Sequence, residues 1–220
     1  MNRTKELLLC AATPNELAGI SNGALSSLKT GVVVDVGKYD VLITGVGIFQ
    51  TVYNLTRALM ECDYEMALSV GVAGDYDNER PLCQLYSVEK SVFADCGFET
   101  KDGGFQPVAG SKFLDGDRPP FQHGYVTNNL AGMLGLQYAT ANTVSRTCTD
   151  PLHVKNLLRK FPADLETMES SAFTYVCARQ NVPRAEIRCT SNHVVPKRQE
   201  EWRLKEAVEV LGAAVEKMIK

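Results

Sequence analysis

The sequence has no run of about 20 apolar residues, which a membrane-spanning helix needs, and no cluster of basic residues. Lys and Arg number 23 against 26 Asp and Glu, so the formal net charge is −3. These absences argue against a membrane or a nucleic acid as the main partner. The apolar stretch that follows Glu6 has only the length of a strand, whereas a signal peptide needs a longer one. We therefore expect a cytoplasmic protein that acts on a small molecule.

Metal-binding and disulfide patterns are also missing. The seven cysteines are odd in number, scattered and without Cys-x-x-Cys spacing, and the three histidines are not spaced to share a metal with them. Free thiols in a reducing compartment are therefore expected. No motif implies a metal or an organic cofactor. The cysteines are Cys10, Cys62, Cys83, Cys96, Cys148, Cys177 and Cys189.

Strand and helix patterns alternate along the chain, which predicts an α/β fold. Several predicted strands are apolar on both faces, as in a parallel sheet covered by helices. We expect a single domain over residues 1–220, a three-layer α/β/α sandwich with a central mixed, largely parallel sheet. The predicted strands cover 7–12, 32–36, 39–44, 67–71, 84–94, 137–144 and 185–190. Helices are predicted to follow Pro14, to lie in 48–61 and within 125–134, and to cover 150–160 with Asp150 as the N-cap. Two more are predicted, from Glu169 to about Gln180 and from about Arg198 to the end.

Two segments are ambiguous. Gly45-Val46-Gly47 begins like a dinucleotide-binding fingerprint, but Gln50 stands in place of its third glycine. We interpret it as a tight turn between a strand and a helix. The Gly- and Pro-rich segment 95–120 shows no regular pattern and is expected to be a long loop, of the kind that forms lids or binding surfaces.

Polar or small residues follow three of the predicted strands, and Glu169 ends a short extended segment that begins at Asp164 and turns directly into a helix. Ligands of open α/β sheets bind beyond the carboxyl ends of the strands, so these four places are expected to converge. Glu169 and Glu16 each stand in the first turn of a predicted helix, where a favourable interaction with the helix dipole is the alternative explanation. The four places are Glu16, Gly71 to Asp75, Glu169 and Asn192.

The same four places resemble the motifs of the nucleoside phosphorylase and nucleosidase family, most closely its bacterial hydrolase branch. Thr167-Met168-Glu169-Ser170-Ser171-Ala172 is similar to the family's E-M-E-G-A-A motif, and Gly71-Val72-Ala73-Gly74-Asp75 to its G-S-A-G-G loop. Arg188-Cys189-Thr190-Ser191-Asn192 is similar to R-x-x-S-D, and the segment 11–16 to the turn whose last acid orients the attacking water.

The resemblance implies roles for these residues. Glu16 would activate water, and Glu169 and Met168 would bind the ribose. Asn192 would hold the base, in a pocket lined by Val72, Ala73 and Gly74. Arg188 would contribute to substrate binding, although a structural ion pair explains it equally well, and Met168 is equally compatible with simple core packing.

Asn192 departs from the aspartate of adenine-specific relatives. An amide offers a donor and an acceptor without a titrating proton, which favours a 6-oxopurine over adenine. The segment 187–207 looks most like the futalosine hydrolases of that branch, which release hypoxanthine in menaquinone biosynthesis. The alternatives are an adenine nucleosidase acting on methylthioadenosine, adenosylhomocysteine or aminofutalosine, a 6-oxopurine nucleoside phosphorylase, and a non-catalytic nucleoside sensor. The family also implies a homodimer or a higher homo-oligomer.

Overall fold

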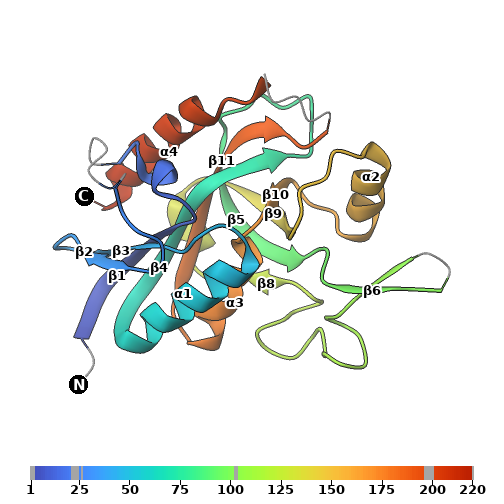
Figure 1. Ribbon diagram of the computed structural model, residues 1–220, viewed down its shortest axis with the longest axis horizontal. Coiled ribbons are helices and arrows are strands. Elements are labelled where there is room, and N and C mark those ends of the chain that lie inside the picture. Colours follow the sequence, from blue (N-terminus) through green and yellow to red (C-terminus); the bar gives the residue numbers. More distant parts are fainter. Residues whose placement is uncertain (1–2, 21–24, 26, 102–103, 196–200, 220) are drawn as a thin grey trace.

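One mixed sheet of nine strands forms the centre of the molecule (Figure 1). The computed structural model describes residues 3–20, 25, 27–101, 104–195 and 201–219. Eight strands follow the order β10-β9-β5-β11-β4-β1-β3-β2, and β8 pairs with β5. The strands are β1 (Arg3–Ala11), β2 (Val33–Asp35), β3 (Asp40–Ile43), β4 (Cys62–Asp75), β5 (Leu85–Phe93), β8 (Val126–Thr127), β9 (Gln137–Thr143), β10 (Leu165–Thr167) and β11 (Arg184–His193).

Helices cover both faces of this sheet. Successive side chains of a strand point to opposite faces of the sheet, so a strand that is apolar at every position packs into a hydrophobic core on each face. Leu9 of β1 packs in the cluster that holds Leu211 of α4 (Leu204–Ile219), whereas Leu8 packs with Leu55 of α1 (Ile48–Glu61) and Phe173 of α3 (Ser170–Arg179). The predicted three-layer α/β/α sandwich is confirmed, with α4 on one face and α1 and α3 on the other.

The sheet is largely parallel, as predicted. β4 runs parallel to β1 on one side and to β11 on the other, and β9 runs parallel to β5 and to β10. The carboxyl end of β4 also pairs antiparallel with β10, in the register Leu165↔Asp75 and Glu166↔Gly74. This pairing brings the start of α3 next to the carboxyl ends of β4 and β11.

Several expected boundaries were wrong. The helix after Pro14 is a single 3-10 turn, η1 (Pro14–Leu17), and Gly19 lies so close to Gly212 of α4 that a Cβ on Gly19 would lie 3.0 Å from the Gly212 Cα. The strand predicted over 67–71 is longer at both ends, because β4 runs from Cys62 to Asp75. The expected loop 95–120 contains a hairpin of β6 (Gly97–Glu99) and β7 (Phe105–Pro107).

The remaining helices follow the sequence more closely. α2 (Pro151–Lys160) has the predicted N-cap, where the Asp150 side chain accepts a hydrogen bond of 2.9 Å from the Leu152 N–H. A short 3-10 helix, η3 (Ala131–Leu134), lies within the predicted range 125–134. The final helix begins at Leu204, and the predicted start at Arg198 lies outside the described residues. No described helix is long and apolar enough to cross a membrane.

Candidate active site

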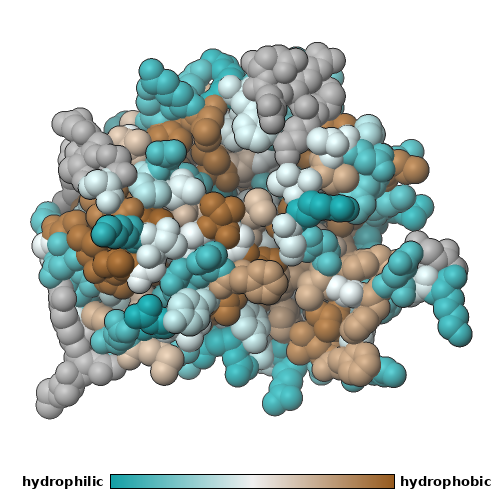
Figure 2. Space-filling view, in the orientation of Figure 1, coloured by the Kyte–Doolittle hydropathy of each residue, from teal (hydrophilic) through white to brown (hydrophobic). Residues whose placement is uncertain are grey.

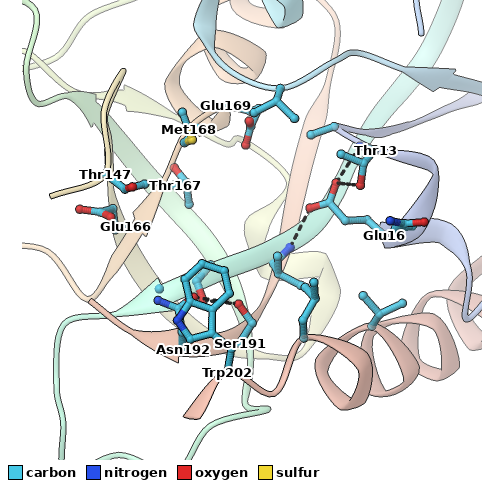
Figure 3. A pocket seen from close by; sticks show the side chains of 18 residues that line it. Thr13, Glu16, Thr147, Glu166, Thr167, Met168, Glu169, Ser191, Asn192 and Trp202 are labelled. Atoms are coloured by element: carbon cyan, nitrogen blue, oxygen red, sulfur yellow. Dashed lines mark hydrogen bonds between the residues drawn. The ribbon is translucent and has the colours of Figure 1, made fainter. Parts of the chain in front are cut away.

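A cavity of about 340 Å³ opens where β1, β4, β10 and β11 end (Figure 3). Seven of the eight predicted site residues line it, and they come from four separate parts of the chain. Arg188 is the exception. The described lining consists of Ala12, Thr13, Asn15, Glu16, Val46, Val72, Ala73, Gly74, Thr147, Glu166, Thr167, Met168, Glu169, Ser191, Asn192, Trp202, Leu204 and Val208.

Glu16 is fixed at the rim of β4 by hydrogen bonds to both carboxylate oxygens. Oε2 accepts from the Thr13 N–H at 2.9 Å, and Oε1 accepts from the Val72 N–H at 3.0 Å. The first bond is half of a capping box, in which the third residue of a helix caps its N-terminus. The buried carboxylate is therefore both part of the η1 cap and an acceptor exposed to the cavity.

Glu169 is held by a contact that spans 122 residues of sequence. Its Oε1 accepts a hydrogen bond of 2.8 Å from the Gly47 N–H, which precedes α1. Gly47 has φ of +86°, a conformation that glycine adopts without strain. The segment 45–47 is the predicted turn from a strand to a helix, and it also orients a carboxylate of the site. Glu169 is the N-cap residue of α3, so the dipole of that helix also favours its negative charge.

Arg188 lies behind the cavity wall, with 1% of its surface exposed. Its Nε donates to Glu186 Oε1 at 2.7 Å and its Nη2 donates to Ser69 Oγ at 3.2 Å. Glu186 also accepts hydrogen bonds from Ser170 and Asn128. The structural ion pair that the sequence left open is therefore present. A direct contact between Arg188 and a substrate stays a prediction.

The guanidinium of Arg188 acts electrostatically on the two carboxylates in front of it. Burial lowers the pKa of Arg188, but the charges of Glu186, Glu169 and Glu16 raise it more, so it stays cationic. Burial raises the pKa of Glu169 above its usual value, and Arg188 and the Gly47 N–H oppose that rise. Gly71 permits this arrangement, because a Cβ there would overlap the Arg188 guanidinium and reach Glu16.

Asn192 follows an irregularity in the pairing of β11 with β4. Thr190 pairs with Ala73 and Asn192 pairs with Gly74, so Ser191 is an extra residue. Such a bulge changes the direction of the side chains after it. The Asn192 Oδ1 accepts from Ser191 Oγ at 3.0 Å, and its Nδ2 donates to the His193 carbonyl at 3.0 Å. These two hydrogen bonds fix the orientation of the Asn192 amide at the cavity wall.

Lining residues with polar or aromatic side chains that the sequence analysis did not assign to the site include Glu166, Thr147 and Trp202. Glu166 carried no local signal, because its place in the cavity wall follows from the pairing of β10 with β4. Thr147 lies in a connection without a motif. Trp202 is the only tryptophan of the chain, and Figure 3 shows its ring beside Asn192 and Ser191.

Comparison with known proteins agrees with this geometry. The model of the "Phosphorylase superfamily" matches residues 9–220. The futalosine hydrolase of Thermus thermophilus is 33% identical over 81% of this chain and 80% of its own, and that of Streptomyces coelicolor is 30% identical over 82% and 78%.

Solved structures share the fold. A mutant nucleosidase from Helicobacter pylori with 5'-methylthioadenosine in its active site superposes with a TM-score of 0.77 at 14% identity, over 98% of both chains. The native futalosine hydrolase of Helicobacter pylori superposes with a TM-score of 0.75 at 13% identity, over 98% of this chain and 97% of its own.

Proposed function

The chain belongs to the phosphorylase superfamily and, within it, to the futalosine hydrolase family, and on that premise we propose the reaction that it catalyses. It hydrolyses the N-ribosyl bond of futalosine and releases hypoxanthine and dehypoxanthine futalosine, a step of menaquinone biosynthesis. The observation that carries the proposal is the position of Glu16, Glu169 and Asn192 on the wall of one cavity.

Cleavage of an N-ribosyl bond builds positive charge on the sugar and negative charge on the departing base. A fixed carboxylate beside the sugar therefore stabilises the transition state more than the ground state. Glu169 takes this role, accepting hydrogen bonds from the ribose hydroxyls while Gly47 holds its other side. Met168 precedes it in the cavity wall and packs on the ribose face.

Glu16 acts as the general base on the attacking water. Its two oxygens are held by Thr13 and Val72, so the carboxylate needs no rearrangement to accept a proton. General-base catalysis of this kind contributes roughly 10²–10⁴-fold in rate. Figure 3 places Glu16 across the cavity from Asn192, which suits attack on one face of the sugar as the base leaves from the other.

Asn192 binds the leaving purine. Its amide presents a donor for O6 of hypoxanthine and an acceptor for a protonated N7, which stabilises the base as it departs. The strand segment Val72, Ala73 and Gly74 forms the adjacent wall, where small side chains let a planar base approach the backbone.

The charges in the cavity favour water over phosphate as the nucleophile. None of its described lining residues is Lys or Arg, whereas Glu16, Glu166 and Glu169 all line it. Phosphate recognition uses Arg, Lys or clustered N–H groups, and three carboxylates repel a phosphate dianion. Hydrolysis is therefore proposed ahead of phosphorolysis.

The test is release of free base from futalosine, aminofutalosine, inosine and 5'-methylthioadenosine, each with and without phosphate. Release of hypoxanthine from futalosine at a rate independent of phosphate is expected. Phosphate-dependent release from inosine would make the chain a phosphorylase, and preferred cleavage of an adenine nucleoside would make it a nucleosidase of the other type. Tight binding without any release would leave a nucleoside sensor.

We also propose a single domain that works as a homodimer or higher oligomer, in the cytoplasm. One sheet connects both halves of the chain, and all seven cysteines are free, which suits a reducing compartment. Phe49 is 86% exposed and Tyr53 63% exposed on α1, the helix that begins two residues after Val46 of the cavity lining. Figure 2 shows apolar side chains near the centre of this face, by the N-terminal end of α1. A second copy covering this surface would close the cavity.

A further inference from the structure

Glu166 is a third carboxylate of the cavity, and neither the ribose role nor the water role uses it. It lies in the middle of β10, a strand whose three residues are all buried. Its backbone pairs with Gly74, in the wall proposed for the purine. Figure 3 shows Glu166 on the opposite side of the view from Glu16, beyond Asn192. Glu166 therefore belongs to the base half of the cavity.

Gly74 provides a measure of how close Glu166 is to Asn192. A Cβ built on Gly74 would lie 3.3 Å from the Asn192 Nδ2 and 3.7 Å from the Glu166 Cβ. The amide and the base of the glutamate side chain thus flank the same point of the wall. Two polar groups so placed can contact neighbouring atoms on one edge of a single planar base.

The carboxylate has an internal donor that fixes it. The Tyr76 hydroxyl donates to Glu166 Oε2 at 3.3 Å. Burial, together with the nearby charge of Glu166, raises the pKa of Tyr76 well above its usual value, so the hydroxyl keeps its proton. A buried carboxylate is costly unless it is hydrogen-bonded, and an ionised one only accepts hydrogen bonds. Glu166 is thus a fixed acceptor in the wall of a ligand cavity.

We propose that Glu166 accepts a hydrogen bond from N1–H of the purine and, with Asn192, makes the site specific for 6-oxopurines. This proposal rests on the proposed function. A 6-oxopurine presents a donor at N1 beside an acceptor at O6, and the carboxylate and the amide NH2 match that pair. Adenine presents the reverse pattern, an acceptor at N1 beside a donor at the 6-amino group. The lone pair of its N1 would face a carboxylate, which leaves both groups unsatisfied.

The test compares Glu166→Gln with the wild-type enzyme on futalosine and aminofutalosine. Glutamine has the same shape, but it offers a weaker acceptor and adds a donor that adenine can use. The ratio of kcat/KM for futalosine to that for aminofutalosine should fall by about tenfold or more, the effect of losing one hydrogen bond to a charged group. Inhibition by free hypoxanthine should weaken while inhibition by free adenine strengthens. Glu65 is an exposed glutamate at the other end of β4, so Glu65→Gln is the matched control. It should leave the ratio of the kcat/KM values and the inhibition by both free bases unchanged.

If Glu166 has only a structural role, the result is different. Equal losses of kcat/KM on futalosine and aminofutalosine, or an unchanged ratio of the two values in a folded variant, would overturn the proposal. If Glu166→Gln does not fold, Tyr76→Phe is tested instead, because it removes the hydroxyl that donates to Glu166. The ratio of kcat/KM for futalosine to that for aminofutalosine should again fall, by a smaller factor. An unchanged ratio would overturn the proposal.

The two proposals fail separately. If the wild-type protein does not cleave futalosine, the proposed function fails. Calorimetric binding of hypoxanthine and adenine to wild type and Glu166→Gln still tests how the base is recognised. A preference of the wild type for hypoxanthine that the variant loses supports Glu166, and equal preference in both proteins overturns it.

Discussion

Glu16 combines a structural and a chemical role in one side chain. Its oxygens accept from the Thr13 and Val72 N–H groups, and the same carboxylate faces the cavity. The side chain of the Glu16→Gln variant has only one acceptor oxygen, so one of the two N–H groups loses its partner. We expect the single-turnover rate on futalosine to fall roughly 10²–10⁴-fold and stability to fall by about 1 kcal/mol.

The control for that prediction is Glu6→Gln, an exposed glutamate on β1, the strand that leads into η1. It should leave both the rate and the melting temperature unchanged. Rapid chemical quench measures the rate, and thermal unfolding measures the stability. A Glu16→Gln variant with a normal single-turnover rate would mean that another group activates the water.

Glu169 should make the reaction sensitive to acid. Burial raises its pKa, and only its carboxylate stabilises a cationic sugar. The value of kcat/KM should therefore fall as pH drops, with an apparent pKa above the usual value of about 4.3 for glutamate. A profile of kcat/KM against pH measures this. An acid limb that persists unchanged in Glu169→Gln, measured on its residual activity, would assign the titration to another group.

The same pKa shift has a consequence for stability with a definite sign. A carboxyl whose pKa is raised on folding binds its proton more tightly in the folded state, so its contribution is present at low pH and is lost as pH rises through the folded value. Glutamine does not titrate, so Glu169→Gln does not lose this stability as pH rises. The melting temperature of the variant minus that of the wild type should therefore be larger at pH 7 than at pH 4. A difference that is constant with pH would contradict a raised pKa for Glu169.

At the scale of elements, β4 is the strand around which the site is built. It pairs with β1, β11 and β10, and its Gly71 leaves room for the Arg188 guanidinium and the Glu16 carboxylate. Gly71→Ala places a methyl group in that space. We expect a loss of stability of about 1–3 kcal/mol and at least a tenfold loss of activity, because both side chains must move.

Denaturant unfolding and a steady-state assay measure the two effects of Gly71→Ala. Gly132→Ala in η3 is the control, since its added methyl meets only the hydroxyl of Tyr138, a half-exposed side chain that can move. A Gly71→Ala protein with wild-type activity would show that the carboxylates do not depend on this packing.

Local pattern was enough to predict most of these elements. The apolar runs around Leu9, Leu68 and Ile187 gave strands buried on both faces, and Asp150 capped α2 as expected. Four strand ends were expected to converge, and the cavity brings their residues together. This convergence could be predicted because each of the four places is recognisable within a short segment of sequence.

What could not be predicted depends on contacts between distant segments. The hydrogen bond from Gly47 to Glu169 joins two helix N-termini that lie 122 residues apart in the sequence. The pairing of Glu166 with Gly74 follows from sheet register, which no short segment encodes. The bulge at Ser191 likewise appears only when β11 is aligned with β4. Glu166 was overlooked because its position in the cavity wall depends on the pairing of β10 with β4.

At the scale of the whole molecule, the exposed apolar side of α1 predicts an assembly. Phe49→Glu places a charge on the surface that a second copy would cover. We expect the oligomer to dissociate and activity to fall, because the cavity rim at Val46 loses its cover. Analytical ultracentrifugation measures the assembly, with Met133→Glu, an exposed apolar residue on η3, as the control. An unchanged oligomer in Phe49→Glu would move the interface elsewhere.

The most direct test of the whole account is a crystal structure of Glu16→Gln with futalosine bound. We predict the hypoxanthine ring between Asn192 and Glu166, the ribose hydroxyls on Glu169, and a water beside the substituted side chain, in line with the N-ribosyl bond. A purine that lies away from β4 and β11, or a ribose that does not reach Glu169, would contradict the account at its centre.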